Sequence, residues 1–283
     1  MIRQRWASWL LRAIAPTLLG LFLWAFWLEP ASLTVVQQRI VVPLRGNADL
    51  RVAVLSDLHV GSPYNGIDNL KRVIERTNSL KPDFVCILGD LVIQGVKGGH
   101  FVPAEDIASE LKGLKSTYGS FAVLGNHDFW LDYLRVEKAL RNNGITVVED
   151  TAVRLDTNAG ELWLVGIGDW MTGRARVNTG LAHVTDDAPV IALTHNPDVF
   201  PYVPARVSLL LAGHTHGGQV RLPLLGAPIV PSAFGQRYVA GYVNESGRQL
   251  YVSTGIGTSI LPVRFLVPPA IALLTLSNFQ SAR

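Results

Sequence analysis

Short apolar runs alternate with longer amphipathic stretches along most of the chain after Pro30. Between the earlier runs, apolar residues recur at helical spacing over residues 67–80, 104–116 and 131–143. Strands that alternate with helices in this way predict an α/β domain. The runs that have the length and composition of strands are residues 51–56, 83–89, 119–125, 161–168, 189–194 and 207–213.

After Gly217 the pattern changes to strand-like segments separated by Gly and Pro turns. These segments are QVRL, RYVAGYV, RQLYVST and AIALLTL. We therefore expect the C-terminal third to be mostly β-structure. With 283 residues, of which 48% are hydrophobic and 17% charged, the chain has enough apolar material for one large domain and a short appendage.

The first thirty residues form a different kind of segment. They are uncharged from Ala13 to Leu28 and carry tryptophans toward both ends. Crossing a bilayer takes about 20 residues of helix, and aromatic residues gather at its two interfaces. This pattern predicts an uncleaved transmembrane anchor over residues 1–30, followed by a linker and first strand region over 31–49 and the main domain over 50–283. A cleaved signal peptide and a buried helix are the alternatives.

The charges that flank the apolar segment predict an orientation. Arg3, Arg5 and Arg12 precede it, whereas Glu29 follows it. Positive charges stay on the cytoplasmic side of a membrane. We therefore expect a single-pass protein of a bacterial-type inner membrane, with its main domain outside the cytoplasm.

Overall charge and cysteine content narrow the function classes. The net charge of +3 is small, and the basic residues are scattered without a Lys/Arg tract, which argues against nucleic acid as a partner. Cys86 is the only cysteine, so no intrachain disulfide can form. Its apolar neighbours predict a buried, inert thiol.

Polar side chains follow directly after five of the predicted strands. Open α/β sheets place their ligand sites at these strand ends, and carboxylate, imidazole and amide groups all bind metals. Each motif alone fits an ordinary turn or helix cap, but five in succession predict a metal centre. The segment GHTHGG is the most specific, because flanking glycines let backbone and metal approach closely. The residues are Asp57 and His59; Asp90; Asn126, His127 and Asp128; His195; and His214 and His216.

The motifs SDLHVG, GDL, GNHD, TH and GHTHGGQ resemble those of the calcineurin-like metallophosphoesterases, from about residue 50 to the end. GHTHGGQVRL and YVSTGIGTS resemble the membrane-linked branch of phosphodiesterases and UDP-2,3-diacylglucosamine pyrophosphatases. The resemblance implies a four-layer α/β/β/α sandwich with a dinuclear metal centre. It also implies hydrolysis of a phosphodiester or pyrophosphate bond, by attack of a hydroxide that bridges the metals.

The resemblance further implies a role for each strand-end residue. Asp90 would bridge the two metals, and His127 would contact the scissile phosphate and assist the leaving oxygen. Two divalent ions such as Mn, Fe or Zn suit nitrogen and oxygen ligands without thiolate, and the sequence does not choose among them. The implied ligands are Asp57, His59, Asp90 and His216 for one metal, and Asp90, Asn126, His195 and His214 for the other.

One position departs from the pattern of the family. Many members carry a second aspartate three residues after the bridging one, where it orients the catalytic histidine, but this chain has Ile93 there. Asp128, Gln94 or a backbone carbonyl could orient His127 instead. Alternatively, proton donation is weak and the leaving group correspondingly good.

The resemblance makes a membrane-associated or lipid-linked phosphoester the expected substrate. Its most specific form is UDP-2,3-diacylglucosamine, hydrolysed in lipid A biosynthesis, although a nucleotide sugar is cytoplasmic and conflicts with the predicted orientation. The apolar loop 221–235 is either a packed connection or a lip that touches an acyl chain. A non-catalytic metal-binding surface protein and a nuclease are the alternatives. The sequence assigns no oligomeric state.

Overall fold

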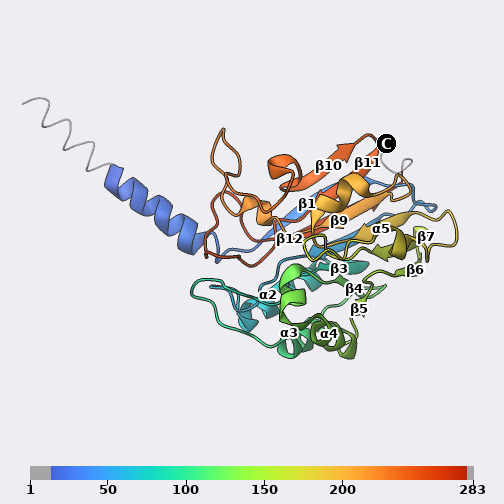
Figure 1. Ribbon diagram of the computed structural model, residues 1–283, viewed down its shortest axis with the longest axis horizontal. Helices are drawn as coiled ribbons and strands as arrows, with labels where there is room; N and C mark the ends of the chain where they lie inside the picture. Colours follow the sequence, from blue (N-terminus) through green and yellow to red (C-terminus); the bar gives the residue numbers. More distant parts are fainter. Residues whose placement is uncertain (1–13, 279–283) are drawn as a thin grey trace, which may run out of the picture.

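Two six-stranded mixed sheets pack face to face in the computed structural model, which describes residues 14–278 (Figure 1). The first sheet has the order β1 (Thr34–Val41), β12 (Ala270–Ser277), β2 (Leu50–Leu55), β3 (Phe84–Leu88), β4 (Ser120–Val123) and β5 (Thr146–Val147). The second has the order β10 (Gly241–Glu245), β11 (Arg248–Val252), β9 (Leu209–Ala212), β8 (Val190–Leu193), β7 (Gly160–Gly166) and β6 (Ala152–Thr157). The central strands of both sheets run parallel, so their carboxyl ends meet at one edge.

The run FVCIL shows why the strands are apolar throughout. All five residues of β3 are buried, and they alternate between two cores. Val85 and Ile87 face the helices, whereas Phe84, Cys86 and Leu88 lie between the two sheets. Cys86 is fully buried and unpaired, as predicted, and burial raises the pKa of its thiol well above the usual range.

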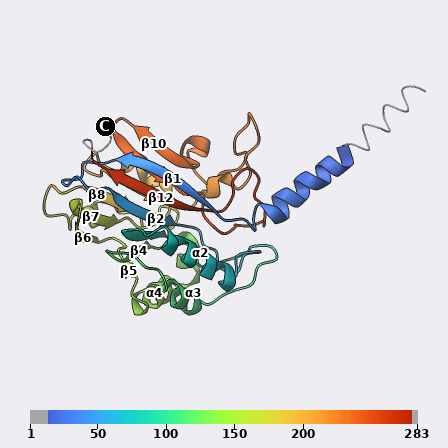
Figure 2. The same ribbon diagram turned by 180° about the vertical axis from the view of Figure 1, so that it is seen from behind.

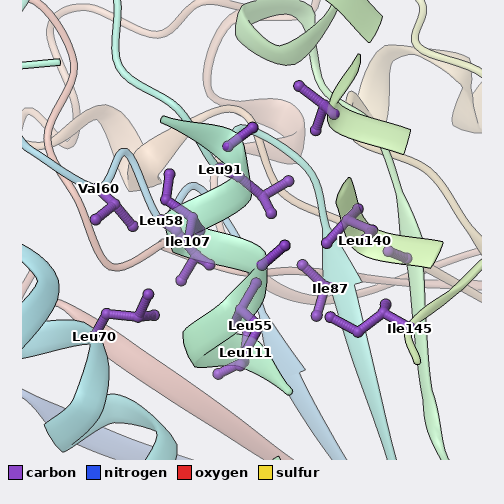
Figure 3. Packing of buried hydrophobic residues seen from close by; sticks show 14 of the residues in the cluster. Leu55, Leu58, Val60, Leu70, Ile87, Leu91, Ile107, Leu111, Leu140 and Ile145 are labelled. Carbon is purple, nitrogen blue, oxygen red and sulfur yellow. The ribbon is translucent and has the colours of Figure 1, made fainter. Parts of the chain in front are cut away.

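Helices cover the outer face of the first sheet. They are α2 (Ile67–Ser79), α3 (Ala104–Leu111) and α4 (Asn126–Asn142), seen together in Figure 2. Their apolar faces meet the sheet in one cluster, to which the helices contribute Leu70, Ile107 and Leu140 and strand β3 contributes Ile87 (Figure 3). Helices therefore cover one face of the first sheet, and the second sheet covers its other face.

Only short helices cover the outer face of the second sheet. These are α5 (Val177–Leu181) and the 3-10 helices η2 (Pro197–Tyr202) and η4 (Gly235–Tyr238), and Phe200 and Tyr238 are buried there at 1% and 0% exposure. The predicted α/β class and the pair of sheets are confirmed. The fourth layer of the predicted sandwich consists of these short segments.

The six strands predicted before Gly217 are all present. The differences are strands β5 and β6, which were not predicted, the helix ends and the C-terminal third. The helix predicted for 131–143 begins at Asn126, because Gly125 N donates to the Asp128 carboxylate (3.0 Å) and starts the helix earlier. QVRL does not form a strand, since Gln219 has a φ of +56°. The helix predicted for 104–116 ends at Leu111, where Gly113 N turns back to Glu110 O (2.8 Å).

The prediction of a membrane anchor is wrong. Residues 14–23 are α-helical and continue as the π-helix η1 (Trp24–Leu28), and no helix within residues 14–278 is long and apolar enough to cross a membrane. The helical hydrogen bonding changes at Trp24, whose carbonyl accepts from Glu29 N (2.9 Å), and the chain then turns into the domain. The predicted single-pass membrane location is therefore also wrong, and the orientation predicted for it no longer applies. Residues 1–13 of the predicted anchor lie outside the described residues.

Candidate metal centre

The structure brings the seven predicted ligands together at the edge where strands β2, β3, β4, β8 and β9 end. Besides a group that joins His59, Asp90 and His127, the ligand atoms of all but Asn126 form two groups, in each of which all atoms lie within 4.8 Å of one another. Every member of both groups is buried. Asp57, His59 and His216 make up the first group, and Asp90, His195 and His214 make up the second.

The carboxylate of Asp90, a member of the second group, also faces the first group. Its Oδ2 is 3.5 Å from Nε2 of His59 and 3.2 Å from Nε2 of His195. Its other oxygen, Oδ1, accepts from the backbone N–H of His127 (2.9 Å). One oxygen of Asp90 therefore faces both groups, as a bridging ligand requires.

The imidazole rings are oriented so that free nitrogens face each other. Nδ1 of His59 lies 3.1 Å from Val92 O, and Nδ1 of His195 lies 2.7 Å from Leu88 O, so each ring, when neutral, can donate there and keep its lone pair on Nε2 for a cation. Nε2 of His59 is 3.1 Å from Nε2 of His216, and Nε2 of His195 is 3.1 Å from Nδ1 of His214.

This arrangement contains more buried acceptors than donors. Besides the facing imidazole nitrogens and two carboxylates, Oδ1 of Asn126 is buried without a hydrogen-bond partner in residues 14–278. Buried acceptors of this kind are satisfied by a cation. The residues therefore fit a pair of divalent ions, whereas a packed polar core would pair these atoms with donors.

The backbone is strained at five of these positions. Asp57, His59, Asp90, His214 and His216 all have φ between +39° and +70°. Residues other than glycine rarely occupy this region, at a cost of order 1 kcal/mol each, and such strain clusters at functional sites. Left-handed turns thus occur at the ends of β2, β3 and β9, where these side chains point into the centre.

Two glycines of the motifs are required by close approach. A Cβ at Gly125 would overlap the carboxylate of Asp90, and one at Gly213 would overlap the hydroxyl of Ser56 and stand 2.7 Å from Oδ2 of Asp57. Any other side chain would displace these carboxylates. The glycines that precede Asn126 and His214 thus let the ligands pack around the centre.

Burial and neighbouring charges shift the titration of the ligands. Burial raises the pKa of Asp57 to about 6 and lowers the pKa of His59 to about 4. Burial also acts on Asp90 and His195, but their mutual attraction outweighs it, so the pKa of Asp90 falls well below its usual range and that of His195 rises.

His127 lies beside the two groups, with its ring packed edge-on against His59 (4.8 Å between ring centres) and tilted against Trp130 (5.1 Å). Burial lowers the pKa of His127. Within residues 14–278 its Nδ1 has no hydrogen-bond partner. Packing against two rings therefore positions the imidazole of His127.

Within residues 14–278, Nδ1 of His127 forms no hydrogen bond with Asp128, Gln94 or a backbone carbonyl, the partners expected from the sequence. Asp128 instead accepts from the backbone N–H groups of Leu91 (2.9 Å) and Gly125 (3.0 Å). Ile93 is buried at 7% exposure, at the position where many relatives have an aspartate. The departure from the family pattern thus replaces a polar contact with apolar packing.

A cavity of about 420 Å³ opens over the centre. Asp90, Asn126, His127, His214 and His216 are among the residues that line it, and no described lysine or arginine is among them. Its walls are apolar. The wall residues that sequence reasoning did not single out are Trp130, Met171 and Ile260, whereas Ile229 and Pro231 lie in the loop 221–235 that was proposed as a lip.

The comparisons with known proteins agree with this geometry. The family described as calcineurin-like phosphoesterase matches residues 50–218, more than half of the chain. The chain belongs to this family. It is therefore a metal-dependent hydrolase of phosphoesters, and the dinuclear metal requirement of the family fits the clustered aspartates and histidines. Which residue binds which ion stays a prediction.

Relatives of the calcineurin-like phosphoesterase family align over nearly the whole chain. The uncharacterized metallophosphoesterase YkuE of Bacillus subtilis is 31% identical, covering 95% of this chain and 94% of its own. The phosphodiesterase YaeI of Escherichia coli is 30% identical, covering 88% and 90%. The solved structure of the phosphopantetheinyl hydrolase PptH from Mycobacterium tuberculosis aligns with 74% of this chain and 91% of its own, at 14% identity and a TM-score of 0.47.

Proposed function

We propose that this phosphoesterase hydrolyses a phosphodiester bond at a dinuclear centre held by the seven predicted ligands. The observation that carries the proposal is the oxygen of Asp90 that faces two groups of buried ligands at the base of a cavity. The imidazole of His127 lines the same cavity. The ligands are Asp57, His59, Asp90, Asn126, His195, His214 and His216.

Two divalent ions held by these residues would supply an activated water and would neutralise the charge that grows on the phosphoryl oxygens. The ligands of this chain match Mn, Fe or Zn, since they offer nitrogen and oxygen but no thiolate. Carbonyls of Val92 and Leu88 hold two of the imidazoles in position. His127, at the wall of the cavity, donates a proton to the leaving oxygen.

The cavity walls favour a substrate with an apolar ester group next to the phosphate. Proteins bind phosphate-rich ligands such as nucleotides and DNA through arginine and lysine, and no described lysine or arginine lines this cavity. Trp130, Ile229 and Ile260 offer an apolar surface instead. This favours a phosphodiester with one apolar alcohol, including a lipid-linked one, over a pyrophosphate such as UDP-2,3-diacylglucosamine and over a nuclease substrate.

The decisive experiment compares two chromogenic esters. The full chain, loaded with Mn, should release p-nitrophenol from bis(p-nitrophenyl) phosphate and not from the monoester, and the Asp90→Ala variant should release none. Hydrolysis of the monoester alone would refute a diesterase. Bound metal without hydrolysis of either ester would require a trial of UDP-2,3-diacylglucosamine, and failure there would leave a non-catalytic site.

Replacement of Trp130 by alanine should weaken the binding of apolar ester groups. Trp130 is 53% exposed and lines the cavity, so its loss removes contact area worth about 1 kcal/mol. We expect KM for a phenyl or octyl phosphodiester to rise roughly five- to tenfold, while KM for the methyl ester stays the same. Steady-state kinetics on the ester series measure this.

Trp170 offers a matched control for this prediction. It is 37% exposed and stacks on Tyr202 (5.0 Å between ring centres), and it is not among the residues that line the cavity. Trp170→Ala should leave the whole ester series unchanged. An equal rise of KM for methyl and octyl esters in Trp130→Ala would show that the wall does not bind the ester group.

A further inference from the structure

We propose that Arg264 is a positioning residue of the metal centre, and that Glu29 holds it in place from the N-terminal segment. The proposal rests on the proposed metal ligands, and it assigns this network to one of the two groups only. Arg264 and Glu29 are buried at 0% and 4% exposure and lie outside the family match, which covers residues 50–218.

The guanidinium of Arg264 is bound by backbone carbonyls. Nη1 donates to Val267 O (2.9 Å), and Nη2 donates to Thr254 O (3.0 Å) and Gly257 O (2.6 Å). Arg264 forms no ion pair with any described residue. Burial lowers the pKa of its guanidinium to about 10. Burying a guanidinium costs several kcal/mol, and the hydrogen bonds to these carbonyls offset part of that cost. Two of the bonds fix residues 254–257 against Arg264.

The segment that Arg264 holds, residues 254–257, lies directly against the first ligand group. Gly257 N donates to Asp57 O (2.7 Å). A Cβ at Gly255 would stand 2.7 Å from Cβ of Asp57, and one at Gly257 would stand 2.6 Å from Cβ of His59. Any movement of residues 254–257 therefore displaces two of the three ligands in this group.

The third ligand of the group is supported by the same residues. His216 is followed by Gly217, at which a Cβ would meet Val267 Cγ1 at 2.7 Å and Thr254 Cγ2 at 3.0 Å. Both neighbours carry carbonyls that Arg264 binds. The guanidinium thus lies behind all of Asp57, His59 and His216. In the second group, Leu88 O holds His195 (2.7 Å), which also contacts His214 and Asp90. This group meets the first where His214 N donates to the Asp57 carboxylate (3.1 Å) and where Asp90 Oδ2 lies 3.5 Å from His59 Nε2, so we expect Arg264 to act on the second group only indirectly, through the first.

The N-terminal segment fixes the position of Arg264. The carboxylate of Glu29 accepts from the backbone N–H groups of Leu266 (3.0 Å) and Val267 (2.5 Å) and from Trp24 Nε1 (2.5 Å). Arg264 N also donates to Ala25 O (2.9 Å). A continuous series of hydrogen bonds therefore joins residues 24–29 to the first ligand group.

The test is a titration of the metal-free full chain with Mn, followed by calorimetry. The wild-type chain should bind two ions. Arg264→Ala should lower the affinity for one ion by about tenfold or more and leave the other within about twofold, and added methylguanidinium should restore part of the loss. Glu29→Gln, which keeps the shape of the side chain, should weaken the same ion to a smaller extent.

Arg248 provides the matched control. Its Nη1 also donates to backbone carbonyls, those of Phe200 (3.4 Å), Pro201 (2.9 Å) and Val203 (3.3 Å), none of which belongs to the centre. Arg248→Ala should lower Tm and leave both Mn affinities unchanged. Equal weakening of both ions in Arg264→Ala, or the same Mn affinities as in Arg248→Ala, would overturn the proposal.

Two further outcomes are a variant that does not fold and a chain that binds metal without hydrolysing an ester. If Arg264→Ala does not fold, Glu29→Gln decides, since unchanged affinities in that variant overturn the proposal. If the wild-type chain binds two Mn ions but hydrolyses no ester, the proposed function fails while the difference between the two ions still tests the role of Arg264.

Discussion

Replacement of Asp90 by alanine is expected to remove both metal ions and to abolish hydrolysis. Oδ2 of Asp90 faces His59 at 3.5 Å and His195 at 3.2 Å, so both ligand groups lose the same oxygen at once. Activity should fall by more than the roughly 100-fold that the loss of an outer hydrogen-bond partner of a metal ligand costs. Metal content after dialysis, measured by mass spectrometry, and the rate on the diester check this.

The control for Asp90→Ala is another buried carboxylate. Asp198 is 3% exposed, accepts from Ser232 Oγ (2.5 Å) and Ala233 N (2.7 Å), and belongs to neither ligand group. Asp198→Ala should lower Tm but keep two metals per chain. Two metals retained by Asp90→Ala would contradict a bridging role for this carboxylate.

Replacement of His127 by alanine should keep both metals and slow turnover by about 100-fold on esters with poor leaving groups. The contact between His127 and Asp90 is made by the backbone N–H (2.9 Å), so it survives in the variant. Esters of p-nitrophenol should be affected less, since that leaving group needs no proton. The dependence of kcat on the pKa of the leaving alcohol should therefore be steeper in His127→Ala than in the wild type.

A second variant separates proton donation from packing. His127→Phe keeps a ring against His59 and Trp130 but carries no proton to donate. It should show the same steep dependence on the leaving group as His127→Ala. A uniform loss across all leaving groups in both variants would mean that the imidazole only shapes the cavity.

The sequence was sufficient for six central, buried strands and for the polar residues at their ends, but not for the edge strands β5 and β6. Segments such as FVCIL are buried on both faces, so their continuous apolar composition distinguishes them from the amphipathic helices. The polar residues that follow such segments mark the ends of the parallel strands. The strand predicted for QVRL does not form, because the side chain of Gln219 hydrogen-bonds to the backbone of Ser259. Its Nε2 donates to Ser259 O (3.1 Å), and its Oε1 accepts from Ser259 N (2.6 Å). Such a contact across forty residues leaves no periodic signal.

The N-terminal segment shows the limit of reading hydrophobicity alone. An apolar run that ends in Glu29 has the composition of an anchor, but composition does not reveal that this carboxylate binds the backbone of residues 266 and 267. The predicted domain boundary after residue 30 would separate Glu29 from the domain. The lone arginine in LPVRF, within an otherwise apolar segment, was the signal that could have suggested a buried partner network.

The position of Cys86 makes the unmodified protein its own reporter of opening. As the only thiol, it lies fully buried between the two sheets, so a thiol reagent can reach it only when the sheets separate. When the sheets close faster than the reagent reacts, the labelling rate relative to that of a free thiol therefore gives the free energy of that separation. Because β3, which carries Cys86, leads straight to Asp90, metal ligation at the edge and cohesion of the sheets can be followed in one experiment, without introducing a probe.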